Sequence, residues 1–162
     1  MSGRKNYYKK MKPKIFITGS SGFIGFHVAK KLLDLGLKVH GYDSMNSYYD
    51  VNLKRARLSI LKKYKNFSFT KGLLENEKKV RNINVRFKPN IIIHLGAQAG
   101  VRHSINNPNI YIKSNIIGTY NILKIASKMK IKHLLIGSSS SVYGANKDFP
   151  FKEIDKTDHQ VS

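Results

Sequence analysis

Three glycines, Gly19, Gly22 and Gly25, follow the apolar residues 15–17 at the spacing of a phosphate-binding loop. Gly19 would let the backbone turn off a strand, Gly22 would let main-chain amides approach a pyrophosphate, and Gly25 would let a following helix pack closely. The helix N-terminus itself favours an anion. Because turns collect glycine in any case, a plain turn is the alternative interpretation of this motif alone.

A carboxylate stands where a dinucleotide site needs one. Asp43 ends a second predicted strand, residues 39–42, about 20 residues beyond the glycines. There it could accept both hydroxyls of an adenosine ribose and repel a ribose phosphate, which favours NAD over NADP. The alternative is an acid in a turn or helix cap, since Ser44, Asn46 and Ser47 follow. Together, the glycine loop and the acid predict a mononucleotide-binding βαβ unit.

Two later strand ends carry small and polar residues. Residues 94–100 follow the apolar run 91–93, and residues 137–144, with four consecutive serines, follow residues 133–136. Ligands of open parallel sheets bind at the carboxyl ends of the strands, so both segments are candidate site loops. A tight turn and a solvated serine loop are the alternatives for each segment taken alone.

The elements that position these residues alternate between strand and helix. The predicted strands are 15–17, 39–42, 66–71, 91–93 and 133–136, and the predicted helices are 23–35, 51–64, 75–87 and 108–130. The fold class is therefore α/β, a Rossmann-like doubly wound parallel sheet truncated after about five strands.

Helical spacing also predicts which faces are buried. The expected apolar faces are Phe23, Ile24, Val28, Leu32 and Leu35 in the first helix and Ile112, Ile116, Tyr120, Leu123 and Ala126 in the last. The lysines of helix 51–64 are interpreted as a solvated face.

Composition narrows the function classes. The chain has 162 residues, which predicts one domain over residues 12–162 preceded by a disordered basic extension, residues 1–11, with no separate substrate domain. There is no cysteine and the six histidines lack ligand spacing, so we expect no metal. No apolar run approaches the roughly 20 residues of a membrane span, and no signal peptide is visible, which favours the cytoplasm.

The formal charge of +21, from 30 Lys and Arg against 9 Asp and Glu, raises nucleic acid as a partner. The basic residues are dispersed, however, and form no recognition motif. We therefore expect no specific nucleic-acid partner and only weak, salt-sensitive binding.

These motifs resemble the NAD-dependent epimerase/dehydratase family, the extended short-chain dehydrogenases, and within it most closely the UDP-glucuronate 4-epimerases. The resemblance runs from about Lys12 to Ser162. Its marks are the glycine loop and residues 41–50, 97–102, 114–119 and 138–144. It implies NAD as the cofactor, a UDP-sugar substrate, and a homodimer for full-length members. It also implies that NAD takes a hydride from C4 of the sugar and returns it to the opposite face.

The resemblance implies roles for individual residues. Phe23 and Ile24 would donate backbone amides to the pyrophosphate, and Asn46 would lie beside the ribose held by Asp43. The cofactor would be lined by Leu95, Gly96, Ala97 and Gln98. Asn115 would lie near the nicotinamide, although a polar residue on a mixed helix face is its alternative. Ser139 would be the catalytic hydroxyl on the reacting sugar oxygen, with Ser140 beside it in substrate binding, and Arg102 would meet anionic substrate or solvent.

The chain departs from the family pattern at Leu73, where an acid is usual, at Gly96, where alanine is usual, and at His103, where tyrosine is usual. The family's catalytic Tyr-x-x-x-Lys pair is expected a few residues beyond Ser162. Tyr8 with Lys12, Tyr120 with Lys124 and Tyr143 with Lys147 have the spacing but not the context. The sequence thus predicts the cofactor-binding N-terminal part of a UDP-sugar 4-epimerase, inactive alone. A noncatalytic NAD- or nucleotide-binding module and a basic nucleic-acid-associated protein are the alternatives.

Overall fold

The structure, a computed structural model, describes residues 13–147 and 149–157. The predicted extension, Tyr8 with Lys12, and residues 158–162 lie outside the described residues. None of the helices in the part that the structure describes is long and apolar enough to cross a membrane.

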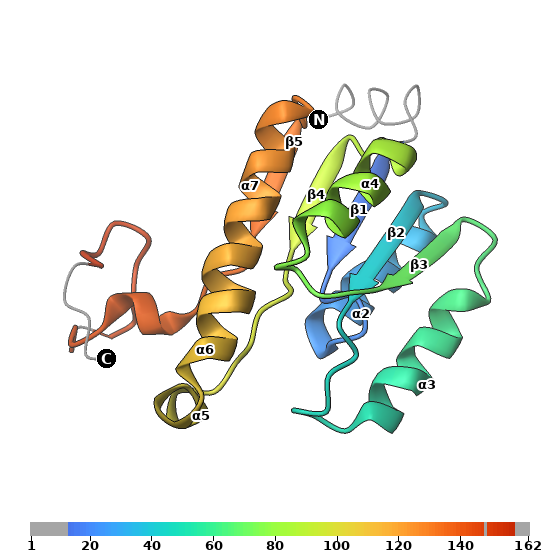
Figure 1. The fold of residues 1–162 in the computed structure, drawn as a ribbon. Coiled ribbons are helices and arrows are strands. Elements are labelled where there is room, and N and C mark those ends of the chain that lie inside the picture. The colour runs from blue at the N-terminus through green and yellow to red at the C-terminus, as the bar shows by residue number, and fades with distance from the viewer. Residues whose placement is uncertain (1–12, 148, 158–162) are drawn as a thin grey trace.

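Five parallel strands form one sheet (Figure 1). They are β1 (Lys14–Thr18), β2 (Lys38–Asp43), β3 (Phe67–Lys71), β4 (Ile91–His94) and β5 (His133–Ile136). Their order across the sheet is β3-β2-β1-β4-β5. The chain therefore leaves β1 toward β2 and returns to place β4 on the other side of β1, which confirms the predicted doubly wound parallel sheet.

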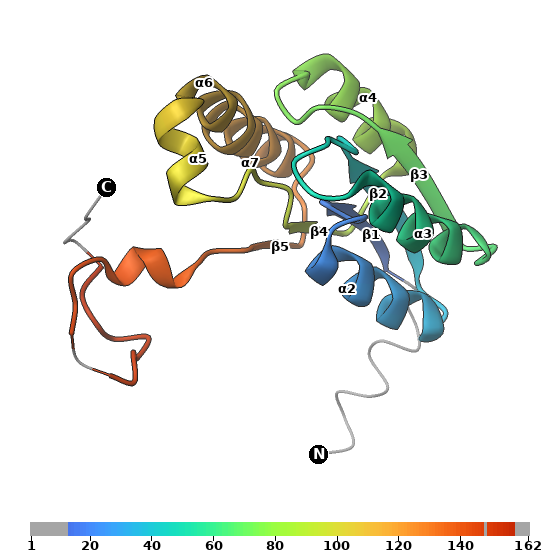
Figure 2. The same cartoon turned by 90° about the horizontal axis from the view of Figure 1, so that it is seen from below.

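Helices cover both faces of this sheet (Figure 2). Helices α2 (Phe23–Asp34) and α3 (Val51–Lys62) lie on one face, where Phe26, Ala29 and Leu33 join Ile15 and Leu61 in one core cluster. Helices α4 (Glu77–Phe87) and α7 (Gly118–Lys128) lie on the other face. The cluster there comprises Phe16, Tyr42, Leu74, Val80, Ile92, Ile122 and Ile125. Two cores with strands shared between them are what a doubly wound sheet requires.

The single helix predicted over residues 108–130 is divided in the structure. It consists of α6 (Pro108–Tyr111), a π-helical segment η1 (Ile112–Ile117) and α7, and it ends at Lys128. Two short elements were not predicted, the helix α5 (Val101–Asn106) and the 3-10 helix η2 (Ser140–Tyr143). A π turn cannot be seen in an apolar period, because it changes the hydrogen bonding of one turn only.

The predicted apolar faces of two helices were wrong in part. In α2, Val28 and Leu32 pack against the core as expected. Phe23, Ile24 and the C-cap residue Leu35 are exposed instead, and the buried residues are Gly25, Phe26, Ala29 and Leu33. Small side chains at Gly25 and Ala29 allow the helix to lie close to the glycine loop and the sheet, and this contact selects the face.

In α7 and η1, Ala126 of the predicted face packs against the core, but Ile112, Ile116, Tyr120 and Leu123 are exposed. The buried face carries Asn121, Ile122 and Ile125, and Asn121 Nδ2 donates to Leu74 O at 3.0 Å. Because a polar residue occupies the buried face, the apolar period pointed to the other one.

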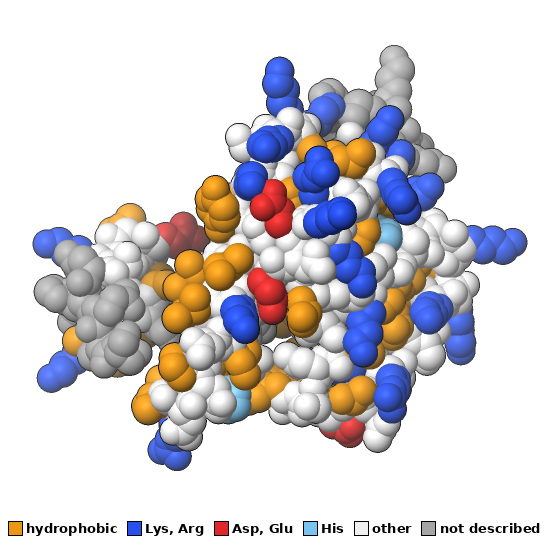
Figure 3. Space-filling model, in the orientation of Figure 1, with side chains coloured by type: hydrophobic (Ala, Val, Ile, Leu, Met, Phe, Trp, Pro, Cys, Tyr) orange, Lys and Arg blue, Asp and Glu red, His pale blue; other side chains and the backbone are white. Residues whose placement is uncertain are grey.

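Basic side chains are spread over most of the face in Figure 3 rather than gathered on one element. This distribution agrees with the dispersed charge seen in the sequence. The same view shows apolar side chains along α7 and η1, the exposed set defined above.

Candidate functional site

The candidate site lies at the carboxyl ends of β1, β2 and β4. In Figure 1 this edge faces α5 and the start of α3. Because β2 and β3 lie on one side of β1 and β4 and β5 on the other, the strand order reverses at β1, and an open parallel sheet leaves a crevice at such a point. The glycine loop, Asp43 and residues 95–100 all follow these strands.

The glycine loop turns directly off β1 into α2. Gly19 has φ +69°, and its N–H donates to Tyr42 O at 2.8 Å. A Cβ at Gly25 would overlap the carbonyl oxygen of Gly19, so only glycine lets the first turn of α2 approach the loop. The expected turn at Gly19 and the expected close approach at Gly25 are both present, although Gly25 packs on the loop rather than on the sheet.

The N-terminus of α2 has backbone N–H groups that are available to an anion. The helical N–H···O bond of Phe26 reaches back to Gly22 O at 3.0 Å, so the N–H groups of Phe23 and Ile24 precede it. No side chain caps this terminus, and its first turn carries no acid. Within the part of the chain that the structure describes, the buried hydroxyls of Ser20 and Ser21 have no hydrogen-bond partner. The free N–H groups of this helix end fit a pyrophosphate, which would accept from them.

Asp43 braces the loop from the end of β2. The side chain is 7% exposed. Its Oδ2 accepts from Ser21 N–H at 2.9 Å, and its Oδ1 accepts from Met45 N–H at 2.8 Å. The interpretation of Asp43 as an acid in a turn is therefore confirmed. A carboxylate has further lone pairs, so a ribose hydroxyl could also be accepted.

Thr18 holds the loop after β4, and His94 connects Thr18 to Thr119. Thr18 Oγ1 accepts from the N–H groups of Leu95, at 3.1 Å, and Gly96, at 2.9 Å. It also lies 2.7 Å from His94 Nδ1, and His94 Nε2 lies 3.0 Å from Thr119 Oγ1. The carboxyl ends of β1 and β4 and the start of α7 are thus joined through one imidazole.

The hydrogen-bond geometry fixes the tautomer of His94. Because Thr18 Oγ1 already accepts two amide protons, its own proton goes to His94 Nδ1. The ring proton is then on Nε2, which donates to Thr119 Oγ1. Burial lowers the pKa of His94 to about 4, which keeps the ring in this neutral form.

Gln98 and Asn115 connect the same loop to the π-helical segment. Asn115 Oδ1 accepts from Gln98 N–H at 2.8 Å, and Asn115 Nδ2 donates to Gln98 O at 2.9 Å. The side-chain amide of Asn115 therefore bonds to both the N–H and the C=O of Gln98, as a backbone partner would. The alternative of a merely polar residue on a mixed helix face does not describe this contact.

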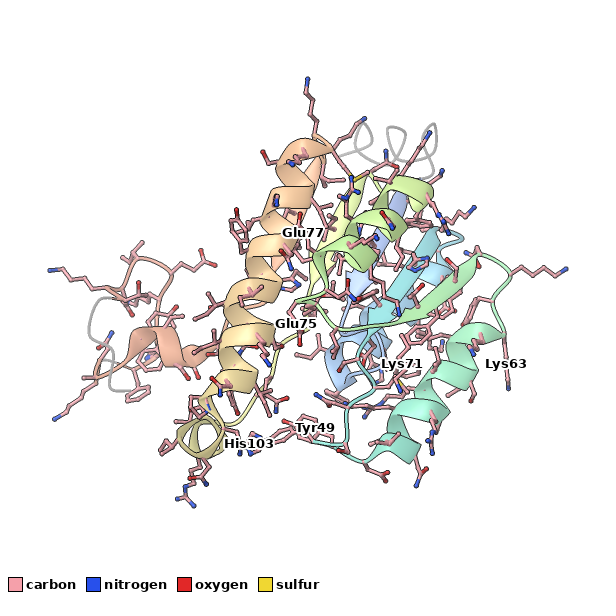
Figure 4. The ribbon with its side chains drawn as sticks, viewed as in Figure 1. Tyr49, Lys63, Lys71, Glu75, Glu77 and His103 are labelled. Carbon is pink, nitrogen blue, oxygen red and sulfur yellow. The ribbon has the colours of Figure 1, made fainter. Side chains whose placement is uncertain are left out.

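An aromatic cluster, Tyr48, Tyr49, His103 and Tyr111, crosses the open end of the site. The Tyr48 ring centroid lies 4.7 Å from that of Tyr49 and 4.9 Å from that of His103. In Figure 4, Tyr49 and His103 lie close together between the start of α3 and α5. Tyr111 OH donates to Ala99 O at 2.7 Å. The segment after β2 is thereby packed against the segment after β4.

Of the predicted substrate residues, Ser139 and Ser140 lie apart from this cluster of loops, whereas Arg102 directly precedes His103 of the aromatic cluster. Ser139 is the N-cap of η2, where its Oγ accepts from Ser141 N–H at 3.3 Å, and both Ser139 and Ser140 are exposed. Arg102 is exposed on α5. Residues 137–147 and 149–157 extend outward beyond β5 (Figures 1 and 2). The structure thus brings together the residues expected to hold a cofactor but not those expected to hold a sugar.

Sequence reasoning missed Thr18, His94 and Thr119, and it misplaced Lys54. The lysines of α3 were interpreted as a solvated face, but Lys54 is 7% exposed. A signal was present, because Lys54 shares helical spacing with Leu58 and Leu61 and so lies on the buried face. His94 could have been found only from its position at a strand end. Among the described residues, no group of three potential metal-ligating side chains comes together.

Comparisons with known proteins agree with this geometry. Residues 16–160 match the sequence model described as GDP-mannose 4,6 dehydratase. A probable UDP-glucuronate 4-epimerase of Rhizobium meliloti is 44% identical over 149 residues, covering 92% of this chain and 44% of that protein. This chain therefore spans less than half the length of that relative.

Two solved structures of similar fold are UDP-glucose 4-epimerases. UDP-glucose 4-epimerase of Thermotoga maritima, solved with UDP-glucose, is 33% identical with a TM-score of 0.74, over 88% of this chain and 44% of that one. The Bifidobacterium longum UDP-glucose 4-epimerase, solved with NAD+ and UDP, is 27% identical with a TM-score of 0.73, over 87% of this chain and 41% of that one.

Proposed function

We propose, since this chain belongs to the NAD-dependent epimerase/dehydratase family, that residues 12–162 form the cofactor-binding part of a UDP-sugar 4-epimerase acting on UDP-glucuronate. The cofactor is NAD. The sugar assignment rests on the relatives, which include UDP-glucuronate 4-epimerases.

One observation carries the cofactor assignment. The uncapped N-terminus of α2 and the unpaired hydroxyls of Ser20 and Ser21 gather beside Asp43. The N–H groups of Phe23 and Ile24 would bind the pyrophosphate, with Gly22 leaving the main chain accessible. Asp43 would accept ribose hydroxyls and disfavour the extra phosphate of NADP, because two anions would then meet.

In the proposed reaction, residues of this chain bind the sugar and the NAD cofactor, which carries the hydride. When bound, NAD supplies hydride removal from C4 of the sugar and its return to the ketone. Leu95, Gly96, Ala97 and Gln98 would line the cofactor on a loop held by Thr18 and Asn115. Ser139 would bind the reacting sugar oxygen and Ser140 would lie beside it, with Arg102 toward the anionic part of the substrate.

Two tyrosine–lysine pairs among the described residues have catalytic spacing, and neither serves as the proton acceptor. On α7, Lys124 Nζ pairs with Glu77 Oε1 of α4 at 2.7 Å, so it is held by a carboxylate near Tyr120. Tyr143 stacks on Phe151 with ring centroids 4.4 Å apart, and it ends η2 before Lys147. We therefore propose that residues 1–162 alone bind NAD without turning over UDP-glucuronate. The general base would be a tyrosine, whose ordinary pKa of about 10 must be lowered toward neutrality by a nearby lysine, and neither pair supplies this arrangement.

The test combines binding with complementation. Calorimetry on the chain should show tighter binding of NAD than of NADP. The chain joined to the downstream half of a UDP-glucuronate 4-epimerase should then epimerise UDP-glucuronate, whereas the chain alone should not. Binding of NAD without turnover by the joined protein would favour the noncatalytic nucleotide-binding module. Turnover by the chain alone would show that a base within it had been overlooked.

A further inference from the structure

Lys54 is a buried cation without a carboxylate partner. Its side chain lies on the inner face of α3 and is 7% exposed. Among the described residues, the ion pairs are Lys30–Asp34 and Lys124–Glu77, so no carboxylate lies within ion-pair distance of Lys54. A buried ammonium needs strong compensating hydrogen bonds, because desolvation disfavours its charge.

Asn46 supplies that compensation. Lys54 Nζ donates to Asn46 O at 2.9 Å and to Asn46 Oδ1 at 2.7 Å. Bonds from an ionised donor are stronger than neutral ones, and two of them from one ammonium fix both the backbone and the amide of one residue. The orientation of Asn46 is therefore set by α3, although Asn46 itself is exposed and follows β2.

The bonds continue across the site. With its Oδ1 facing the ammonium, Asn46 turns its Nδ2 toward Gln98 Oε1 at 3.2 Å. The backbone of Gln98 is held on its other side by Asn115. Four side chains thus link α3, the segment after β2, the loop after β4 and η1. A separate aromatic contact, between Tyr48 and His103, also joins the segment after β2 to the segment after β4.

We propose that Lys54 is a positioning residue, which fixes the spacing between the adenosine side and the nicotinamide side of the cofactor site through Asn46 and Gln98. The effect of Lys54 on cofactor binding rests on the proposed function. The linkage itself is a property of the free chain. Removing the ammonium would leave the Asn46 amide without an orienting partner, and the bond to Gln98 would lose its direction.

The first experiment measures the free chain. Backbone hydrogen exchange is followed at Gln98 N–H, which donates to Asn115, and at Phe26 N–H, which donates to Gly22 in α2. Lys54→Met keeps the buried stem and removes the donors, whereas Lys62→Met removes a charge from an exposed position of the same helix. We expect exchange at Gln98 to become at least about 5-fold faster in Lys54→Met only, with Phe26 unchanged.

The second experiment measures coupling in cofactor binding. Lys54→Met should weaken NAD binding at least about 10-fold, and Lys62→Met by less than about 2-fold. Asn115→Ala should also weaken NAD. If both act through one linkage, the double variant should lose little more affinity than the weaker-binding single variant.

The outcomes separate the two proposals. If the parent chain does not bind NAD, the proposed function fails, and hydrogen exchange alone still decides the role of Lys54. Unchanged exchange at Gln98 in Lys54→Met, or equal acceleration at Gln98 and Phe26, would overturn the positioning role. Fold-losses in NAD affinity that multiply in the double variant would overturn it too.

Discussion

The carboxylate of Asp43 and the backbone N–H of Ser21 are 2.9 Å apart from Oδ2 to nitrogen, which ties the end of β2 to the loop after β1. Asp43 therefore shapes the glycine loop in the free chain. Its two proposed roles, support of the loop and contact with the ribose, predict different effects when the carboxylate is changed.

Asp43→Asn should lower both stability and NAD affinity. Both carboxylate oxygens accept N–H groups, so an amide must direct its own N–H₂ at one of them. For Asp43→Asn we expect a loss of about 1 to 3 kcal/mol in the free energy of unfolding, measured by urea denaturation. For Asp43→Ala we expect a loss of similar size in the free energy of NAD binding, measured by calorimetry. Glu153→Gln, at an exposed position, controls for net charge. Undiminished NAD affinity in both Asp43 variants would remove this residue from the ribose site.

Gly25→Ala should destabilise the chain by more than Gly36→Ala. A Cβ at Gly25 would overlap the Gly19 carbonyl, whereas at Gly36 it would meet nothing within 4 Å and only the φ of +76° is unfavourable. We expect about 1 to 2 kcal/mol for Gly36→Ala and more for Gly25→Ala, measured by denaturation. NAD binding should be lost only in Gly25→Ala. Equal effects of the two variants would show that the helix can retreat from the loop.

Stability should fall as the pH is lowered from about 6.5 toward 5. Burial lowers the pKa of both His40 and His94 to about 4, below the ordinary histidine value of 6.5. The unfolded chain therefore takes up protons that the folded chain refuses, and each histidine contributes up to about 1.4 kcal/mol per pH unit in this window. Above about pH 7 the contribution is fully present.

His40→Asn should remove about half of this slope, as urea denaturation at several pH values would show. His40 lies between the hydroxyls of Ser68 and Thr70, at 2.7 and 3.1 Å. An unchanged slope in the variant would mean that the folded chain accepts a proton at His40.

Leu135→Lys should reduce self-association of the chain. In the part of the chain that the structure describes, β5 pairs with β4 alone, and Leu135 and Ile136 are 45% and 47% exposed. A charged side chain on such an edge opposes further strand pairing. Light scattering over a concentration series should show the difference. The comparison variant is Leu123→Lys, on the exposed apolar face of α7. A larger reduction of self-association in Leu123→Lys would identify α7 as the main surface of association.

Nucleic-acid binding should be unspecific and lost with salt. The lysines are dispersed, so they neutralise phosphates without reading base edges. Titration against random and selected sequences should give equal affinities that fall together as salt rises. A sequence preference that survives about 0.2 M salt would support the nucleic-acid alternative instead.

The sequence by itself determined the order of strands and helices and the position of the glycine loop. Residues 133–136 were predicted as a strand with the bounds that the structure has, because local patterns of apolar residues and glycines carry this information. The parallel, doubly wound arrangement followed, since alternating strands and helices have few other ways to bury both faces.

Only the tertiary structure decided which side chains meet. Helices α2 and α7 each offered more than one apolar stripe, and contacts with Gly19 and Leu74 chose between them. The side-chain bonds of Asn115, the tautomer of His94 and the hydrogen bonds of buried Lys54 all involve partners 8 to 76 residues away in the chain. A local pattern cannot encode such contacts, because their energies arise only when the two segments are already packed together.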